Sequence, residues 1–241
     1  MGGVDPGVLA LAFAAVLIGS TVQSVVGLGV GLVAAPVITL LEPGLMPGVM
    51  IVLAFVLPCV TLVHDHDDID WPGLGWSLPA RVLGTAVGVW VVATFSADQL
   101  GAFIGVIVLL AAALTWRAVT VPVTRSTLSV AGFVSGATGT ATSIGGPPFA
   151  LLYQHRPPAQ IRSTMAVYFL IGAAMSLVGL TISGDLELHQ VAVAALLLPA
   201  LGLGVVLGVP LRRSLPADRV RPAVLLVCSA SALVLVVRSL V

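Results

Sequence analysis

Long apolar runs are the feature of this 241-residue sequence that most constrains its fold. A helix needs about 20 apolar residues to cross a bilayer, and an open sheet edge cannot survive in hydrocarbon. Only 8% of the residues are charged, whereas a soluble domain carries about 25%. The sequence therefore predicts an all-α integral membrane protein with about eight transmembrane helices, at residues 7–41, 46–63, 77–95, 99–119, 127–153, 161–182, 188–211 and 219–240.

Charge and cysteine content exclude several classes of protein. The formal net charge is zero, so the chain offers no basic surface for nucleic acid. Cys59 and Cys228 lie in apolar runs without paired spacing, and we expect no structural disulfide. None of the four histidines lies deep in a predicted span, which disfavours a cofactor-bearing membrane enzyme or electron-transfer subunit. We expect no enzyme activity and no cofactor.

Two of the apolar runs cannot be simple spans. Residues 7–41 would form a helix of about 50 Å, whereas the hydrocarbon is about 30 Å thick. Residues 138–148 read TGTATSIGGPP, with two glycines followed by two prolines. A proline removes one helical hydrogen bond, and the residue before it avoids the helical region. We therefore expect each of these two helices to be broken at its glycines and prolines.

The two halves of the chain resemble each other. The sequence LPARVLGTAVG at 78–88 returns as LPALGLGVVLG at 198–208, and SADQL at 96–100 returns as PADRV at 216–220. We interpret residues 1–120 and 121–241 as two four-helix repeats that together form one transport domain. The first helix of each repeat is the one broken by glycine and proline.

The loops predict an orientation in the membrane. An even number of spans in each repeat implies parallel repeats, unless a re-entrant segment adds a crossing. The acidic loops HDHDDID (64–70) and GDLELH (184–189) are then expected on one side, and the arginine-rich YQHRPPAQIR and PLRRSLPADRVR on the other. The positive-inside rule places the arginines in the cytoplasm. We expect a multi-pass protein of the cell inner membrane with both termini outside the cytoplasm.

The broken helices are the predicted binding site. Backbone groups freed at a break cannot face lipid, so they face protein, water or a solute. A half-helix N-terminus presents open N–H groups and a positive dipole, which favour an anion, and hydroxyls can complete its coordination. We predict one anion site near the bilayer midplane, formed by Ser20, Gln23, Ser24, Gly29 and Gly31 of the first repeat and by Thr138, Thr140, Thr142, Ser143, Gly145, Gly146 and Pro147 of the second.

A packing role is the alternative interpretation of the same residues. Small residues let membrane helices approach closely, and serine and threonine often bond back to their own helix. This alternative stays open for the first segment, while the Gly-Gly-Pro-Pro break favours a binding site in the second.

Polar residues beside the second break extend the candidate site. Gln154 follows the broken segment, and Arg162 begins the next span, where it could attract an anion or anchor to lipid phosphate. Arg81 has the same two interpretations, and its place at the start of a span favours an interface anchor.

The HDHDDID loop is better explained as a solvated acidic loop than as a metal site, because the second repeat lacks the histidine pair.

The sequence resembles the sulfite exporter TauE/SafE family, also called toluene sulfonate uptake permeases. The resemblance covers nearly the whole chain and rests on VVGLGVGLVAAPVI and GFVSGATGTATSIGGPPFALLYQHRPPAQIRSTMAVYF, with DIDWPGLGWSLPARVLGTAVG and GDLELHQVAVAALLLPALGLGVVLG. It implies a secondary transporter of sulfur-containing or organic anions such as sulfite, sulfonates or thiosulfate. Arg162 matches an arginine common in the family at this place.

The direction of transport follows from charge. No Asp or Glu lies deep in a predicted span, although proton-coupled carriers often use one. Expelling one negative charge from a negative interior gains about 2.3 kcal/mol per 100 mV. We therefore expect export of a small anion.

The alternatives are an uptake permease for an organosulfonate or carboxylate, coupled to a proton or sodium ion, and an anion channel. Membrane lipid is an expected partner, and a homo-oligomer stays open.

Overall fold

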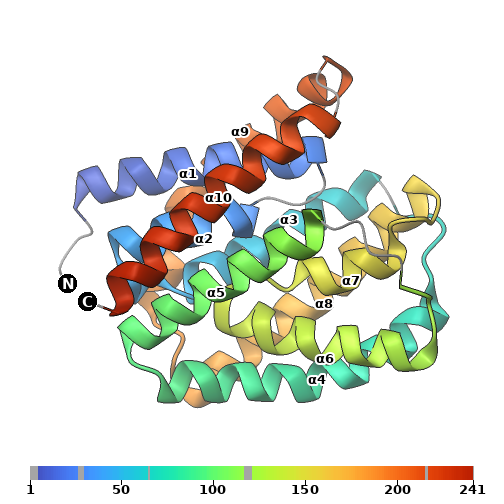
Figure 1. The fold of residues 1–241 in the computed structure, drawn as a ribbon, viewed down its shortest axis with the longest axis horizontal. Coiled ribbons are helices and arrows are strands. Elements are labelled where there is room, and N and C mark those ends of the chain that lie inside the picture. Colours follow the sequence, from blue (N-terminus) through green and yellow to red (C-terminus); the bar gives the residue numbers. More distant parts are fainter. Residues whose placement is uncertain (1–4, 27–29, 65, 117–120, 215–216, 241) are drawn as a thin grey trace.

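The computed structural model describes residues 5–26, 30–64, 66–116, 121–214 and 217–240, and this part of the chain consists of helices joined by short loops (Figure 1). Its elements are α1 (Pro6–Val26), α2 (Val30–Leu41), the 3₁₀ turn η1 (Pro43–Leu45), α3 (Gly48–His64), α4 (Trp71–Thr94), α5 (Ala97–Trp116), α6 (Arg125–Thr142), α7 (Gly146–Tyr153), α8 (Pro158–Ser183), α9 (Leu188–Ser214) and α10 (Ala217–Leu240).

Five of these helices, α1, α4, α5, α8 and α9, are long and apolar enough to cross a membrane. Large apolar side chains cover the outside of the bundle, as Trp90 of α4, Val206 of α9 and Val234 of α10 show. A soluble monomer rarely exposes so many. The prediction of an all-helical membrane protein is confirmed, and the layout of eight spans in two repeats stays a prediction.

Local sequence explains where α4 begins. The Asp70 side chain accepts a hydrogen bond from the Gly73 N–H at 3.0 Å, and Pro72 lies in the first turn. An acidic N-cap followed by proline is a typical helix start. As a result α4 starts at Trp71, six residues before the expected start of this span at residue 77.

Both expected helix breaks occur at glycine clusters. α6 ends at Thr142 and α7 begins at Gly146, with Pro147 in the first turn of α7. α1 ends at Val26 and α2 begins at Val30, and the glycines between them lie outside the described residues. Pro36 lies inside α2 rather than at a break.

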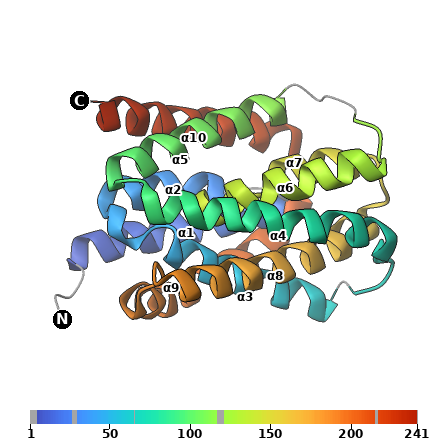
Figure 2. The same ribbon diagram turned by 90° about the horizontal axis from the view of Figure 1, so that it is seen from below.

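Each broken segment folds back on itself as a hairpin. A Cβ at Gly145 would lie 3.0 Å from the Cα of Gly139, so α7 starts beside the last turns of α6. In the same way, a Cβ at Gly19 of α1 would lie 3.1 Å from the Cα of Val30 of α2. Figures 1 and 2 show α7 returning toward the end of the bundle at which α6 begins. The α6–α7 segment is therefore re-entrant.

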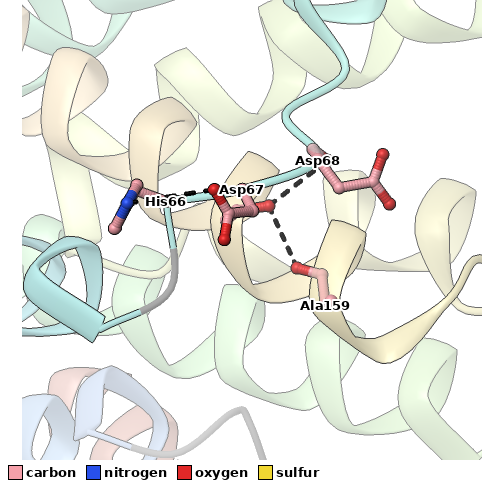
Figure 3. A network of polar contacts seen from close by, with 5 residues as sticks. His66, Asp67, Asp68 and Ala159 are labelled. Atoms are coloured by element: carbon pink, nitrogen blue, oxygen red, sulfur yellow. Dashed lines mark hydrogen bonds and ion pairs between the residues drawn. The ribbon is translucent and has the colours of Figure 1, made fainter.

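The first acidic loop does not lie where the sequence predicted. The Asp70 N–H donates to the Thr164 hydroxyl at 3.0 Å, and Gln160 donates to the Asp68 carboxylate at 3.3 Å. Figure 3 shows His66, Asp67 and Asp68 beside Ala159 in the first turn of α8. This acidic loop thus shares one end of the bundle with the arginine-rich loop that precedes α8.

The second acidic loop lies at the opposite end. It follows the last residue of α8, Ser183, and Gln190 next to it donates to the Gly44 carbonyl at 2.8 Å. The expectation that both acidic loops share one side is therefore wrong. The cause is the re-entrant α6–α7 hairpin, which begins and ends at the same end and so changes the number of crossings.

Glycines hold the central helices together. α4 packs on α6 so closely that a Cβ at Gly88 of α4 would lie 2.7 Å from the Ala137 carbonyl, and one at Gly136 of α6 would lie 2.5 Å from the Arg81 carbonyl. Small residues allow such backbone contact in membrane bundles. α4, α6 and α8 consequently form a compact group around the second break.

Candidate functional site

The centre of the candidate site is the turn between α6 and α7. Ser143 has a φ of 63°, in the left-handed region, and its N–H donates to the Gly139 carbonyl at 2.9 Å. Its hydroxyl donates to the Pro47 carbonyl at 3.3 Å. A Cβ at Gly31 of α2 would lie 2.8 Å from the Ser143 carbonyl oxygen. The second break therefore contacts the glycine segment of the first half.

Close approach explains the glycines of this turn. Gly145 caps the N-terminus of α7, and its carbonyl accepts a hydrogen bond from the Ser135 hydroxyl of α6. A Cβ at Gly145 would lie 2.6 Å from the Ser135 carbonyl, so a side chain would push the two helices apart. Gly146 is the first residue of α7 and Pro147 is buried in its first turn.

The three predicted threonines of α6 have different roles. Thr138 donates to the Val134 carbonyl at 2.9 Å, and Thr142 donates to the Thr138 carbonyl at 2.7 Å. Both hydroxyls bond to carbonyls of their own helix, as serine and threonine hydroxyls often do. Thr140 instead lies 2.7 Å from the Ser176 hydroxyl of α8, and both side chains are buried. Among the described residues, Thr140 is the one of these three threonines whose hydroxyl bonds to another helix.

The predicted residues of α1 lie mainly against α9. The Ser20 hydroxyl donates to the Val16 carbonyl at 2.7 Å, and the Ser24 hydroxyl donates to the Ser20 carbonyl at 3.0 Å. A Cβ at Gly208 of α9 would lie 3.0 Å from the Ser24 hydroxyl oxygen. These contacts are those of helix packing.

Gln23 bridges the first break, because its side-chain oxygen accepts the Val30 N–H at 3.2 Å. Gly29 lies outside the described residues.

Gln154 and Arg162 lie away from the turn. Gln154 directly follows α7, whose eight residues span about 12 Å. Arg162 is half-buried in the second turn of α8, at the end of the bundle that holds Asp70. The structure thus separates these two residues from Ser143, Gly145 and Gly31, which it brings together.

Arg81 is a buried arginine that the sequence interpretation placed at the membrane interface. Its side chain is 4% exposed, so the expected role as an interface anchor is wrong. Because α4 starts at Trp71, Arg81 is the eleventh residue of this candidate span and lies about 15 Å from its start. The signal that could have revealed this was the Asp-Trp-Pro helix start at 70–72.

The Arg81 guanidinium connects three helices. Its Nη1 donates to the Ser135 hydroxyl of α6 at 3.1 Å, and its Cζ lies 4.4 Å from the ring centroid of Tyr168 of α8. A Cβ at Gly172 of α8 would overlap the guanidinium. Since Ser135 also donates to Gly145, one hydroxyl joins the arginine to the helix break.

Aromatic rings continue from Arg81 toward the end of the bundle. Phe149 of α7 stacks on Tyr168 with 3.8 Å between centroids and 4° between planes, and it lies 4.8 Å from the Tyr153 ring. The Tyr153 hydroxyl donates to the Asp70 carboxylate at 2.8 Å. This row of side chains fixes α7 between α8 and the start of α4.

His66, Asp67 and Asp68 of the HDHDDID loop are exposed. His66 Nε2 lies 3.9 Å from an oxygen of Asp67, and both side chains face solvent (Figure 3). Across the described ranges there is no group of three or more His, Cys, Asp or Glu side chains that could hold a metal ion.

These observations define a multi-pass helical membrane protein with a re-entrant, glycine-lined segment in its core. The sequence model of the family described as Sulfite exporter TauE/SafE matches residues 11–235, so the chain belongs to this family. The resemblance seen in the sequence is thereby confirmed. The family implies a membrane transporter of sulfur anions rather than an enzyme. No curated protein and no solved structure matches the chain.

Proposed function

We propose that this protein is a secondary transporter that exports a small sulfur-containing anion, such as sulfite, a sulfonate or thiosulfate, across the cell membrane. The observation that supports it best is the contact between the two glycine-rich breaks, where Gly31 meets the Ser143 carbonyl. Two such segments in contact create a place where backbone groups, rather than bulky side chains, can surround a solute.

The hairpins also support the division of the chain into two repeats. Each half begins with a broken segment, α1–α2 in residues 1–120 and α6–α7 in residues 121–241. The acidic loops of the halves lie at opposite ends of the bundle. We therefore propose two repeats of inverted orientation that form one transport domain, with the substrate between their hairpins.

The arginines support an orientation in the membrane. Arg125, Arg156 and Arg162 lie near the bundle end that holds Asp70. Arg238 lies near the opposite end, where it donates to the Leu40 carbonyl at 3.3 Å. The positive-inside rule then places the Asp70 end in the cytoplasm and both chain termini outside. An anion leaving the cytoplasm would move down the membrane potential.

The test is sulfite flux in liposomes that contain the purified full-length protein. We expect saturable efflux of radiolabelled sulfite, accelerated by unlabelled sulfite on the other side. Gly146→Val should abolish this flux, because a side chain there obstructs backbone approach to the solute. Gly202→Val is the matched control, since Gly202 is exposed on α9 with nothing within 4 Å of its Cβ position.

The same assay separates the alternatives. Flux that rises linearly with concentration and shows no counterflow would favour an anion channel. Import that depends on an imposed proton or sodium gradient would favour an uptake permease. Normal flux through a folded Gly146→Val protein would contradict the binding site at the second break.

A further inference from the structure

We propose that Arg81, Thr85 and Tyr168 form a binding pocket for a compact oxyanion between α4, α6 and α8. This inference rests on the proposed function and identifies the cationic residue of its substrate site. None of the three residues belongs to the set predicted from the glycine-rich segments.

The buried charge of Arg81 has no counter-charge beside it among the described residues. An arginine side chain stays protonated in proteins, and burying a charge is costly unless an opposite charge is close. Arg81 is 4% exposed inside a candidate membrane span, and no carboxylate of the described residues lies within ion-pair distance of it. Its guanidinium contacts the Ser135 hydroxyl and the Tyr168 ring. An anionic substrate would supply the missing counter-charge.

The proposed pocket also contains unsatisfied polar atoms. Arg81 Nε, the Thr85 hydroxyl and the Tyr168 hydroxyl are buried and have no hydrogen-bond partner among the described residues. Such atoms are rare because an unmade buried hydrogen bond is costly. Thr85 follows Arg81 by one helical turn on the same face of α4, and the Tyr168 ring lies against the guanidinium. The guanidinium therefore keeps one unused donor, Nε, and the residues next to it on α4 and α8 offer two more, the Thr85 and Tyr168 hydroxyls.

Glycines make room for the arginine. A Cβ at Gly172 would overlap the guanidinium, and one at Gly139 would lie 3.5 Å from Nη2. The arginine therefore lies against the backbones of α6 and α8 without intervening side chains. A planar guanidinium can bind two oxygens of one ligand, which matches an oxyanion better than a halide. The close packing favours a compact ligand such as sulfite.

The pocket is also connected to the helix break. Ser135 accepts from Arg81 and donates to the Gly145 carbonyl at the start of α7. An oxyanion bound to the guanidinium would compete with the Ser135 hydroxyl for the N–H groups of Arg81. Binding at Arg81 would thus alter the hydrogen bond that fixes the α6–α7 turn, which provides a route from substrate binding to movement of the hairpin.

The experiment compares four variants of the full-length protein: Arg81→Gln, Thr85→Val, Tyr168→Phe and the control Arg125→Gln. The Arg125 guanidinium is exposed and lies 5.0 Å from the Trp76 ring centroid, so the control removes an equal charge outside the pocket. The measurements are stabilisation by sulfite in thermal unfolding and sulfite flux in liposomes. Chloride serves as the non-oxyanion comparison.

We expect Arg81→Gln to weaken sulfite binding at least about tenfold, the size of a lost hydrogen bond to a charged group. Thr85→Val and Tyr168→Phe should each raise the KM for sulfite about threefold to tenfold. Arg125→Gln should behave like the unmodified protein, and chloride should stabilise none of the proteins. If Arg81→Gln fails to fold, the two hydroxyl variants decide the question, because they keep the arginine.

The experiment distinguishes failure of the proposed pocket from failure of the proposed function. Unchanged sulfite affinity in Thr85→Val, Tyr168→Phe and a folded Arg81→Gln, together with normal flux, would overturn the pocket and leave the proposed function intact. An unmodified protein that neither binds nor transports sulfite, thiosulfate or a sulfonate would overturn the proposed function itself. If the role of Arg81 were purely structural, Arg81→Gln would lower the unfolding temperature, and none of the variants would change the KM for sulfite.

Discussion

The carbonyl oxygen of Ser143 lies against the Cα of Gly31, so close that a Cβ at residue 31 would come within 2.8 Å of it. This contact joins the turn of the α6–α7 hairpin to the first turn of α2, and thereby joins the two halves of the chain. Any side chain at residue 31 must push this carbonyl away.

Gly31→Val should therefore separate the two breaks. We expect sulfite flux to fall at least tenfold and the free energy of unfolding to fall by about 1–3 kcal/mol, as for other overpacked sites. Liposome flux and thermal unfolding measure the two effects. Gly75→Val is the control, because Gly75 is exposed on α4 and nothing lies within 4 Å of its Cβ position. Undiminished flux in Gly31→Val would show that this contact is not needed for transport.

Two tyrosines offer a matched comparison of stability. The Tyr153 hydroxyl donates to Asp70 at 2.8 Å, whereas the Tyr168 hydroxyl has no partner among the described residues. Tyr153→Phe should lower the free energy of unfolding by about 1–3 kcal/mol, because it removes a hydrogen bond to a charged group. Tyr168→Phe should lower it less. Denaturation of both proteins without sulfite makes the comparison, and equal losses would contradict it.

The sequence predicts the helices and the second break well because their causes are local. Apolar runs specify spans by length, and Gly145, Gly146 and Pro147 interrupt a helix wherever they lie. The left-handed Ser143 and the N-cap at Gly145 follow directly from that interruption.

The burial of Arg81 could not be predicted in the same way. Its partner Ser135 is 54 positions away, and no periodicity of the sequence places the two together. The expected start of the span at residue 77 also put Arg81 near the interface. The Asp70 cap moves the helix start to Trp71 and carries Arg81 into the interior. A local cap thus changes the environment of a residue eleven positions further along.

The sides of the loops could not be predicted because they depend on counting crossings. Residues 127–153 form one apolar run, and the sequence does not show that α7 turns back along α6. That single reversal places the loop around Asp68 beside Gln160 rather than at the opposite end. Hydropathy reports the length of a segment and not its direction.

Labelling of single cysteines should confirm this arrangement. In a protein whose Cys59 and Cys228 are replaced by serine and alanine, Asp67→Cys and Arg156→Cys should react with a membrane-impermeant maleimide from the same side. Glu187→Cys should react from the other side. All three positions are exposed. Under the proposed orientation, the cysteines at residues 67 and 156 react only after the membrane is permeabilised so that the maleimide reaches the cytoplasmic face. Reaction of residues 67 and 156 from opposite sides would contradict the re-entrant α6–α7 hairpin.

Two glycines of α9 should respond differently to the same substitution. A Cβ at Gly204 would overlap the Ser20 hydroxyl and lie 2.6 Å from the Leu17 carbonyl, whereas one at Gly202 would have nothing within 4 Å. Gly204→Ala should therefore lower the free energy of unfolding by about 1–3 kcal/mol by forcing α1 and α9 apart. Gly202→Ala should leave it unchanged or raise it by up to about 1 kcal/mol, because alanine favours helix. Thermal unfolding of the two proteins measures the difference. Equal stability would mean that α1 and α9 do not pack through Ser20, and the hydroxyls of α1 would then be free to face the substrate.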